Sequence, residues 1–272
     1  MPKISLLWLA ALSALTSRGL AFTRSRVVTR STRYFGAKKG GFGDMQKQAA
    51  KKAAPASSQQ APPMNSIEPI SLRKADDIGL PQFMGGWIIE DPSVCDDLLA
   101  HFNERKKSGA VLEGQVSMKG GMVPIVNKDV KDSLEMSFAP GDTSLAWRKY
   151  LKALQATMQA YVEEYPMAGA YGFFGLNSRT NLQVYPPSGG YKTYHTERTG
   201  KGEPEGSRHL VFMTYLNDVT DAGGTEFYHQ KAVVQPQKGL TIIWPADWTF
   251  THRGVPSPTQ EKGIITGWFN FQ

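Results

Sequence analysis

The chain has 272 residues, of which 40% are hydrophobic, which is enough for one sizeable core and too little for several large domains. Its formal charge of +7 suggests a nucleic-acid role, but residues 1–65 hold 11 Lys or Arg against one acid (+10), whereas residues 66–272 hold 20 basic and 23 acidic residues (−3). Because the positive charge belongs to the amino-terminal segment, we expect no nucleic-acid partner for the folded domain.

The amino-terminal segment, residues 1–21, has the composition of a signal peptide, with a short basic start, an apolar run and small residues before the expected cleavage point. Because a membrane span needs roughly 20 apolar residues, we predict no stable span in the mature chain. Residues 22–40 are rich in arginine and hydroxyl side chains and contain no acid, as is typical of a transit peptide. The succession resembles the bipartite presequence of complex plastids. We therefore predict a plastid protein delivered by the secretory route, with secretion or the endomembrane lumen as the alternative.

A polar segment follows this leader. Residues 41–80 are dominated by Gly, Ala, Lys, Ser, Gln and Pro without a sustained apolar period, so we predict a disordered linker. The folded domain is expected over residues 81–272. It contains the chain's one cysteine, Cys95, so no disulfide can form within a monomer. We expect Cys95 to be a small buried residue.

The first part of the domain, residues 91–165, is predicted to be a helical support. Asp91-Pro92 is typical of a helix start. An apolar stripe of helical period predicts a second helix from about Thr143 to Tyr165. Residues 108–141, between the two helices, combine Gly, Pro and mixed charge and are expected to be loop-like.

The second part, residues 167–272, has short apolar or alternating runs separated by turn residues, which is typical of an antiparallel β unit. The predicted strands are Thr180–Tyr185, Tyr191–Thr196, His209–Leu216, Thr225–Tyr228, Ala232–Gln235, Leu240–Trp244, Thr249–His252 and Gly263–Phe271. Eight short strands fit a double-stranded β-helix, or jelly roll. The predicted fold class is therefore mainly β with flanking helices, which should pack outside one sheet.

Two histidines and one carboxylate stand out within this β region. His195 and Glu197 are separated by two positions, so in a strand their side chains leave on one face and can converge on one ion. His252 can complete the set, because a jelly roll returns distant strands to one mouth. Two histidines and one carboxylate with open positions are the ligands expected for a non-haem Fe(II) oxygenase.

Such an oxygenase must also anchor an oxo-acid. Lys262 heads the last apolar strand and shares a face with Thr266 and Trp268 by period two. It can form a charge-assisted bond to a distal carboxylate, with Thr266 donating beside it. Tyr185 can add a phenol donor.

These motifs carry a family resemblance. Residues 181–271 resemble the prolyl-4-hydroxylase-like branch of the 2-oxoglutarate/Fe(II) dioxygenases, of the phage and algal type with an H-x-E pair. The matching stretches are Leu182-Gln-Val-Tyr185, Gly189-Gly-Tyr191, His195-Thr-Glu197, Tyr215-Leu-Asn217, Gly223-Gly-Thr-Glu-Phe227, Pro236-Gln-Lys-Gly239, His252-Arg-Gly254, Lys262 and Trp268.

The resemblance implies that Tyr185, Tyr215, Lys262 and Thr266 contact 2-oxoglutarate, while His195, Glu197 and His252 are the catalytic metal ligands that hold Fe(II). It implies O2 as co-substrate and ascorbate as a further candidate cofactor. The implied reaction is hydroxylation coupled to decarboxylation of 2-oxoglutarate to succinate and CO2. A peptidyl proline, a free amino acid and another small molecule all remain open as substrates, and the sequence makes no prediction of oligomeric state.

Glu197 departs from the family, whose usual carboxylate ligand is Asp, and its extra methylene moves the carboxylate outward. A minority of family members use Glu, so we interpret this difference as variation rather than loss of the site. Two alternatives to the dioxygenase hypothesis stay open. One is a non-catalytic jelly-roll module that binds a metal or ligand. The other is a cupin-like metalloenzyme without an oxo-acid, which would leave Lys262 and Tyr185 unexplained.

Several other side chains compete for functional roles. His209 and His229 are expected to be structural or exposed, and Glu226 is a rival carboxylate. Arg198 and Arg253 each follow a predicted ligand, so either an acidic substrate group or an exposed salt bridge could be their partner. Trp268 is the tryptophan whose predicted face best places it in the pocket.

Overall fold

The computed structural model describes residues 67–116, 124–200 and 202–272. The predicted signal and transit peptides, residues 1–40, and most of the predicted linker lie outside the described residues. Within the described part of the chain, no helix is long and apolar enough to cross a bilayer.

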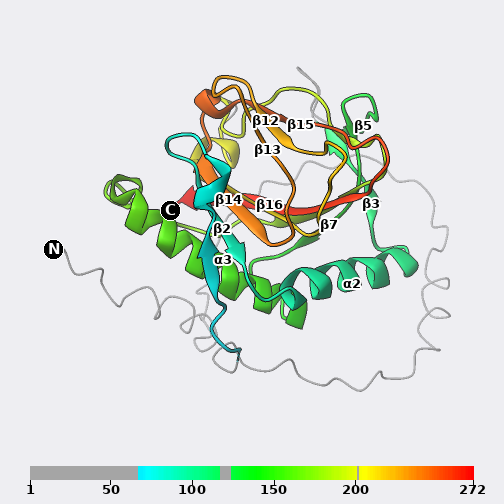
Figure 1. Ribbon diagram of the computed structural model, residues 1–272, viewed down its shortest axis with the longest axis horizontal. Helices are drawn as coiled ribbons and strands as arrows, with labels where there is room; N and C mark the ends of the chain where they lie inside the picture. The colour runs from blue at the N-terminus through cyan, green and yellow to red at the C-terminus, as the bar shows by residue number, and fades with distance from the viewer. Residues whose placement is uncertain (1–66, 117–123, 201) are drawn as a thin grey trace, which may run out of the picture. The chain divides into compact units, whose positions relative to one another are not determined.

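The domain is organised in layers (Figure 1). Two long helices, α2 and α3, run along one side of a large antiparallel sheet, and a smaller sheet of β12, β13 and β15 lies on its other side. The fold is mainly β with flanking helices, a double-stranded β-helix of the kind expected from the sequence.

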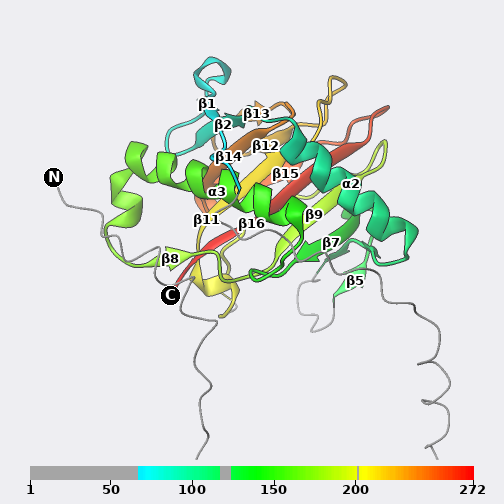
Figure 2. The same ribbon diagram turned by 90° about the horizontal axis from the view of Figure 1, so that it is seen from below.

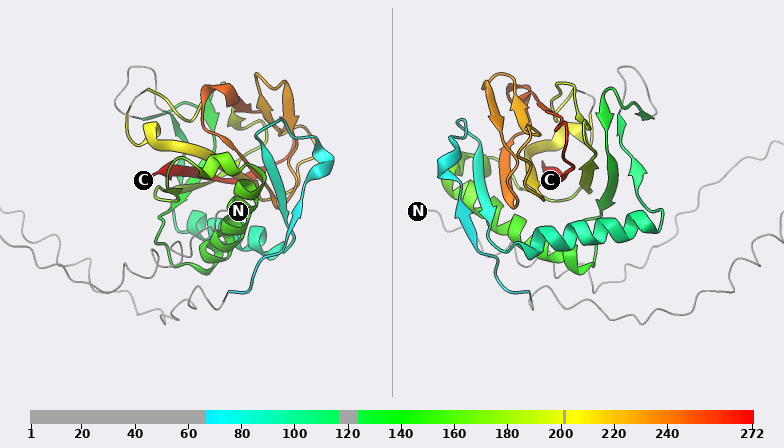
Figure 3. Two further views of the ribbon diagram at one scale, coloured as in Figure 1. Left: turned by 90° about the vertical axis from the view of Figure 1, so that its left-hand side faces the viewer. Right: turned by 45° about the vertical axis from the view of Figure 1, so that its right-hand side comes forward.

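The major sheet is antiparallel throughout, and its two edges stand well apart, one cyan and one green in Figure 3. Its strands, in order across the sheet, are β1 (Leu72–Lys74), β2 (Gly85–Ile89), β14 (Leu240–Pro245), β11 (Arg208–Tyr215), β16 (Lys262–Phe271), β9 (Thr180–Tyr185), β7 (Leu134–Phe138) and β3 (Leu112–Glu113), with β8 (Phe174–Gly175) paired to the end of β16.

The remaining strands are short. The minor sheet has the order β13 (Ala232–Val234), β12 (Thr225–Phe227) and β15 (His252–Gly254); two further pairs are β10 (Gly190–Tyr191) with β6 (Lys131–Asp132), and β4 (Gln115–Val116) with β5 (Ile125–Val126). Short 3-10 turns lie at Asp76–Ile78, Pro166–Gly169, Glu205–Ser207 and Trp248–Phe250.

Helices α2 (Ser93–Lys107) and α3 (Leu145–Glu164) cover the outer face of the major sheet (Figure 2). Helix α2 starts one residue later than the sequence predicts, with Pro92 as its N-cap, and the carboxylate of Asp91 accepts a hydrogen bond from the Ser93 amide at 2.9 Å. The two helices and the sheet share one apolar cluster, which includes Leu98, Phe102, Trp147, Leu154, Leu182, Phe212, Ile265 and Phe269. Burial of these large side chains holds the helices in place.

A second apolar cluster fills the space between the two sheets. It joins Ile242, Trp244 and Ile264 from the major sheet to Phe227 and Val234 from the minor one. Strand β16 serves both clusters, since its even-numbered side chains face the minor sheet and its odd-numbered ones face the helices. The period-two expectation for Lys262, Thr266 and Trp268 therefore places them on the inner face.

Four sequence-based expectations need correction. Strand β1 lies inside the predicted linker 41–80 and pairs with β2, so the sheet begins before residue 81. Residues 108–141 are not simply a loop, because β7 joins the major sheet beside β9. The predicted strand Tyr191–Thr196 ends at Tyr191, and the predicted strand Thr249–His252 is largely a 3-10 turn. There the Phe250 and Thr251 amides bond three residues back, a local pattern that a hydrophobic period does not reveal.

Candidate metal centre and active site

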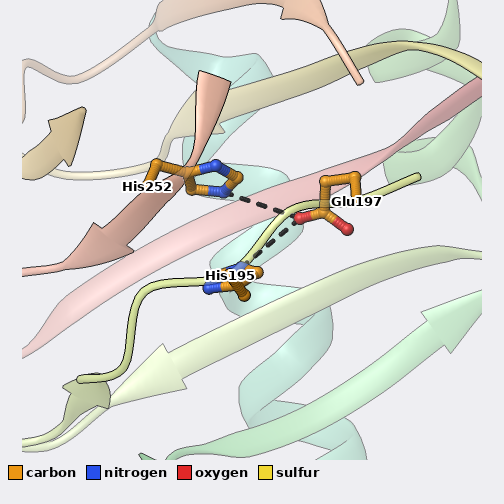
Figure 4. A group of neighbouring side chains, drawn as sticks. All are labelled: His195, Glu197 and His252. Carbon is orange, nitrogen blue, oxygen red and sulfur yellow. Dashed lines mark ion pairs between the residues drawn. The ribbon is translucent and has the colours of Figure 1, made fainter. Parts of the chain in front are cut away.

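Two backbone segments, one with His195 and one with His252, lie side by side at the centre of the candidate site. His195 and His252 form an isolated antiparallel bridge: the His195 amide donates to the His252 carbonyl at 2.9 Å, and the His252 amide donates back at 3.0 Å. The bridge sets the two imidazoles side by side, with ring centroids 4.4 Å apart. Glu197 approaches both rings from the same side (Figure 4).

The three side chains present their ligand atoms to one point. The nearer carboxylate oxygen of Glu197, Oε1, lies 3.5 Å from Nε2 of His195 and 3.5 Å from Nε2 of His252. One ligand atom from each residue lies within 4.8 Å of the others, which among the described residues makes this the one His, Cys, Asp and Glu cluster suited to an ion.

The donor set fits a metal. Nδ1 of His195 lies 3.0 Å from the Thr193 carbonyl, and Nδ1 of His252 lies 2.9 Å from the Phe250 carbonyl. A carbonyl can only accept, so each Nδ1 carries the proton and each Nε2 offers a lone pair. Oε1 of Glu197 lies 3.5 Å from Nε2 of His195 and 3.5 Å from Nε2 of His252, and both distances are too long for a strong hydrogen bond. A cation shared by the three atoms would accept both lone pairs and compensate the negative charge of Glu197.

Electrostatics favour the ligand forms of these groups. Burial alone would raise the pKa of Glu197, but its contacts with His195 and His252 outweigh this effect and hold the pKa well below its usual value. Burial, followed by the charge of His195, lowers the pKa of His252. The carboxylate is therefore ionised and the His252 imidazole neutral at physiological pH.

Aromatic rings fix the orientation of both imidazoles. Tyr191 stacks on His195, with centroids 3.9 Å apart and planes 13° from parallel. Phe227 and Trp244 pack against His252, which is 6% exposed. The sequence alone does not predict a role for Tyr191, although it stands four residues before His195 in a motif already noted.

The second carboxylate oxygen of Glu197 has partners of its own. Trp268 Nε1 donates to Oε2 at 3.0 Å, and Arg208 Nη1 approaches Oε2 at 3.4 Å. Arg208 Nη1 also donates to the Glu197 backbone carbonyl at 2.7 Å. The structure thus places Trp268 in the site, as its face predicts, and adds Arg208, which sequence reasoning missed.

The predicted oxo-acid anchor is a buried cation. Lys262 is 3% exposed and donates to the carbonyls of Gly223 at 2.6 Å and Val255 at 3.2 Å. Burial lowers its pKa to about 8. Tyr185 is its cross-strand partner, and the ammonium lies 5.2 Å from the centre of the Tyr185 ring. Two carbonyl partners leave one of the three ammonium hydrogens for a ligand.

The other residues carried over from the resemblance have protein partners. The Tyr185 hydroxyl donates to Gln183 Oε1 at 2.6 Å. The Tyr215 hydroxyl donates to the Val234 carbonyl at 3.0 Å and lies 2.7 Å from Thr225 Oγ1. The Thr266 hydroxyl donates to the Phe212 carbonyl at 2.9 Å. With these hydroxyl hydrogens engaged, Lys262 is the member of the predicted 2-oxoglutarate set with an uncommitted donor.

The competing side chains have structural partners. His209 Nε2 lies 2.8 Å from the Ala168 carbonyl, as expected for a structural histidine. Glu226 pairs with Arg253 at 2.7 Å instead of joining the metal cluster. Arg198 forms a two-pronged ion pair with Asp247. The salt-bridge alternative therefore holds for both arginines.

Comparisons with known proteins agree with this fold. The sequence model of the 2OG-Fe(II) oxygenase superfamily matches residues 180–270. No curated protein matches the chain in sequence.

Three solved structures share the architecture. A prolyl-4-hydroxylase of Pseudomonas putida is 19% identical, with a TM-score of 0.51, over 74% of this chain and 92% of its own. The viral collagen prolyl hydroxylase of Paramecium Bursaria Chlorella virus-1, in a 2OG complex, is 18% identical, with a TM-score of 0.50, over 70% and 97%. A prolyl hydroxylase of Trichoplax adhaerens, in complex with a hypoxia inducible factor peptide fragment, is 13% identical, with a TM-score of 0.52, over 76% and 86%. At these identities the likeness concerns the fold.

Proposed function

We propose that the chain is a 2-oxoglutarate-dependent Fe(II) dioxygenase that hydroxylates an organic substrate, because residues 180–270 match the sequence model of the 2OG-Fe(II) oxygenase superfamily. The observation that carries the proposal is that His195, Glu197 and His252 converge on one point. The same domain also contains a buried lysine, Lys262, that could bind an oxo-acid. A substrate C–H bond, 2-oxoglutarate and O2 would become an alcohol, succinate and CO2. One oxygen atom of O2 enters each organic product.

The chain's own residues divide the work. His195 Nε2, His252 Nε2 and Glu197 Oε1 would hold Fe(II), which when bound supplies the redox chemistry of O2 and 2-oxoglutarate. Lys262 would bind the distal carboxylate of 2-oxoglutarate through its uncommitted N–H. The Tyr185 ring beside it limits where that carboxylate can lie. Burial of Lys262 and His252 keeps water from competing for these contacts.

The first substrate we propose to test is a peptidyl proline, because the Trichoplax adhaerens neighbour is a prolyl hydroxylase in complex with a peptide fragment. Free amino acids and other small molecules form the parallel arms of the test. Ascorbate is proposed as a reductant that sustains turnover, which would appear as a higher product yield when it is added.

The decisive experiment uses the chain with Fe(II), 2-oxoglutarate and a panel of proline-containing peptides, free amino acids and small metabolites. Mass spectrometry should detect one added oxygen atom in a substrate and an equal amount of succinate. His252→Ala should abolish both signals, whereas Trp248→Phe, at a 65% exposed position, should retain them. A chain that binds metal but shows no 2-oxoglutarate affinity would instead support the non-catalytic binding module.

The location is a separate proposal. The composition of residues 1–21 and 22–40 supports delivery to a complex plastid through the secretory route. Residues 1–40 fused to a fluorescent protein should then enter plastids, and the fusion lacking residues 22–40 should stop in the endomembrane system. Secretion of both fusions would favour the alternative location.

A further inference from the structure

Glu197 has one more methylene than aspartate, and its carboxylate is held from two sides. Oε1 faces His195 and His252 at 3.5 Å, whereas Oε2 meets Trp268 Nε1 at 3.0 Å and Arg208 Nη1 at 3.4 Å. We propose that Arg208 and Trp268 form a clamp that directs a single oxygen of Glu197 to the metal. The inference rests on the proposed metal site and assigns two positioning residues to it.

The clamp answers a physical problem that the longer side chain creates. Glutamate has an additional side-chain torsion, and its terminal carboxylate group turns within a broad range of angles. Without restraint, Glu197 could offer both oxygens to a cation or turn away from the imidazoles. Because Trp268 and Arg208 both donate to Oε2, the carboxylate is held with Oε1 directed toward His195 and His252.

Arg208 and Trp268 restrain each other as well. The guanidinium lies over the Trp268 ring, 3.7 Å from its centre. Arg208 also ties down the Glu197 main chain through the 2.7 Å bond to its carbonyl. Each of the three side chains therefore contacts the other two. A planar guanidinium can stack on the indole and donate hydrogen bonds to Glu197 at the same time, whereas a lysine ammonium cannot.

A β-bulge brings Arg208 to this side of the sheet. In the pairing of β11 with β16, Arg208 is opposite Asn270 and Leu210 is opposite Phe269, so His209 is an extra residue. His209 contacts Phe174 and Phe271, and Leu210 belongs to the helix-side core. Two successive side chains thus point toward the helices.

This bulge reverses the direction of Arg208. Regular alternation from Leu210 would send Arg208 to the helix side, whereas the extra residue turns it inward over Trp268. The arginine would not reach Glu197 without this irregularity.

The test is a double-substitution cycle read by metal affinity. Co(II) binding to the metal-free protein is followed by its visible absorption, for Trp268→Phe and Arg208→Lys in both the native and the Glu197→Asp backgrounds. In the native background each change should weaken Co(II) binding roughly 10- to 100-fold. In the Glu197→Asp background each of these two substitutions should weaken Co(II) binding about twofold or less, because the shorter carboxylate does not reach the indole and guanidinium donors.

The controls separate the clamp from general effects. Trp248→Phe removes an exposed indole that is 65% accessible and should leave Co(II) affinity unchanged in both backgrounds. Melting curves of the metal-free variants report folding independently of the metal, and Arg208→Lys keeps the charge if Trp268→Phe proves unstable.

The outcomes are distinct. Equal losses in the two backgrounds, or no loss in the native one, would overturn the clamp while leaving the metal site intact. Failure of the native protein to bind Co(II) would overturn the clamp and the proposed function together.

Discussion

The affinity for 2-oxoglutarate should fall steeply as the pH rises above about 8. Lys262 is buried, and this burial lowers its pKa to about 8. Its two carbonyl partners, Gly223 and Val255, accept hydrogen bonds but supply no negative charge to offset the burial. The protonated form, which alone can attract a carboxylate, is therefore lost near pH 8 instead of near the usual lysine pKa.

The magnitude follows from the fraction of protein that carries the charged lysine. At about pH 7 roughly nine molecules in ten have Lys262 protonated, and at about pH 9 roughly one in ten. Because apparent affinity scales with the competent fraction, the dissociation constant should rise about tenfold between these two pH values. Lys262→Met should raise it roughly 10- to 150-fold at about pH 7, which is the loss of one charge-assisted hydrogen bond of about 1.5–3 kcal/mol.

Calorimetric titration of 2-oxoglutarate into the Mn(II)-loaded protein, without O2, measures the effect apart from turnover. Pyruvate is the matched control ligand, since it keeps the oxo-acid group but lacks the distal carboxylate. Its affinity should not show the lysine-dependent loss, and Lys262→Met should remove that loss for 2-oxoglutarate. An equal pH dependence for both ligands, or its persistence in Lys262→Met, would refute the assignment of Lys262 as the anchor.

Four further predictions address the metal and the core. His252→Ala should weaken Co(II) binding by more than about 100-fold, as a loss of cobalt absorption would show. Because the pKa of Glu197 is held below its usual value, its stabilising contribution is present above the ordinary pKa and is lost as the pH falls through the lowered one. Glu197→Gln should therefore reduce the acid-induced fall in melting temperature of the metal-free protein. Burial raises the pKa of Cys95 to about 12, so a thiol reagent should modify it only after denaturation. Leu98→Ala, at a fully buried position, should cost about 2–5 kcal/mol in urea unfolding, whereas Leu112→Ala, at a 69% exposed one, should cost less than about 0.5 kcal/mol.

The parts of the fold that the sequence predicts are those governed by a regular period. Strand β16 alternates between two apolar clusters, so counting by two along the sequence is enough to place Lys262 and Trp268 on the same face. Helix α3 follows its apolar stripe from Leu145 to Glu164 for the same reason. Strands β3, β4, β5 and β6 have two residues each, which is too brief for a period to appear.

Arg208 shows why part of the site could not be read from the sequence. Its position is set by the bulge at His209, and one extra residue reverses every side-chain direction before it. His209 and Leu210 give no local signal of the bulge, because a histidine next to a leucine also suits a regular strand. Recognising Arg208 requires the pairing of β11 with β16.

The sequence predicts that His195 and Glu197 converge as neighbours two apart on one strand, yet the strand stops at Tyr191 and the two lie in an irregular segment. They converge instead because the His195–His252 bridge, the Tyr191 stack and the bonds to Arg208 and Trp268 hold that segment from several sides. A segment without a continuous ladder can follow a carboxylate that is longer by one methylene, whereas a regular strand would resist the shift. The irregular backbone and the glutamate are thus consistent with each other. The substitution Glu197→Asp alone would leave the Trp268 and Arg208 donors without Oε2, so its effect on metal affinity should depend on both residues.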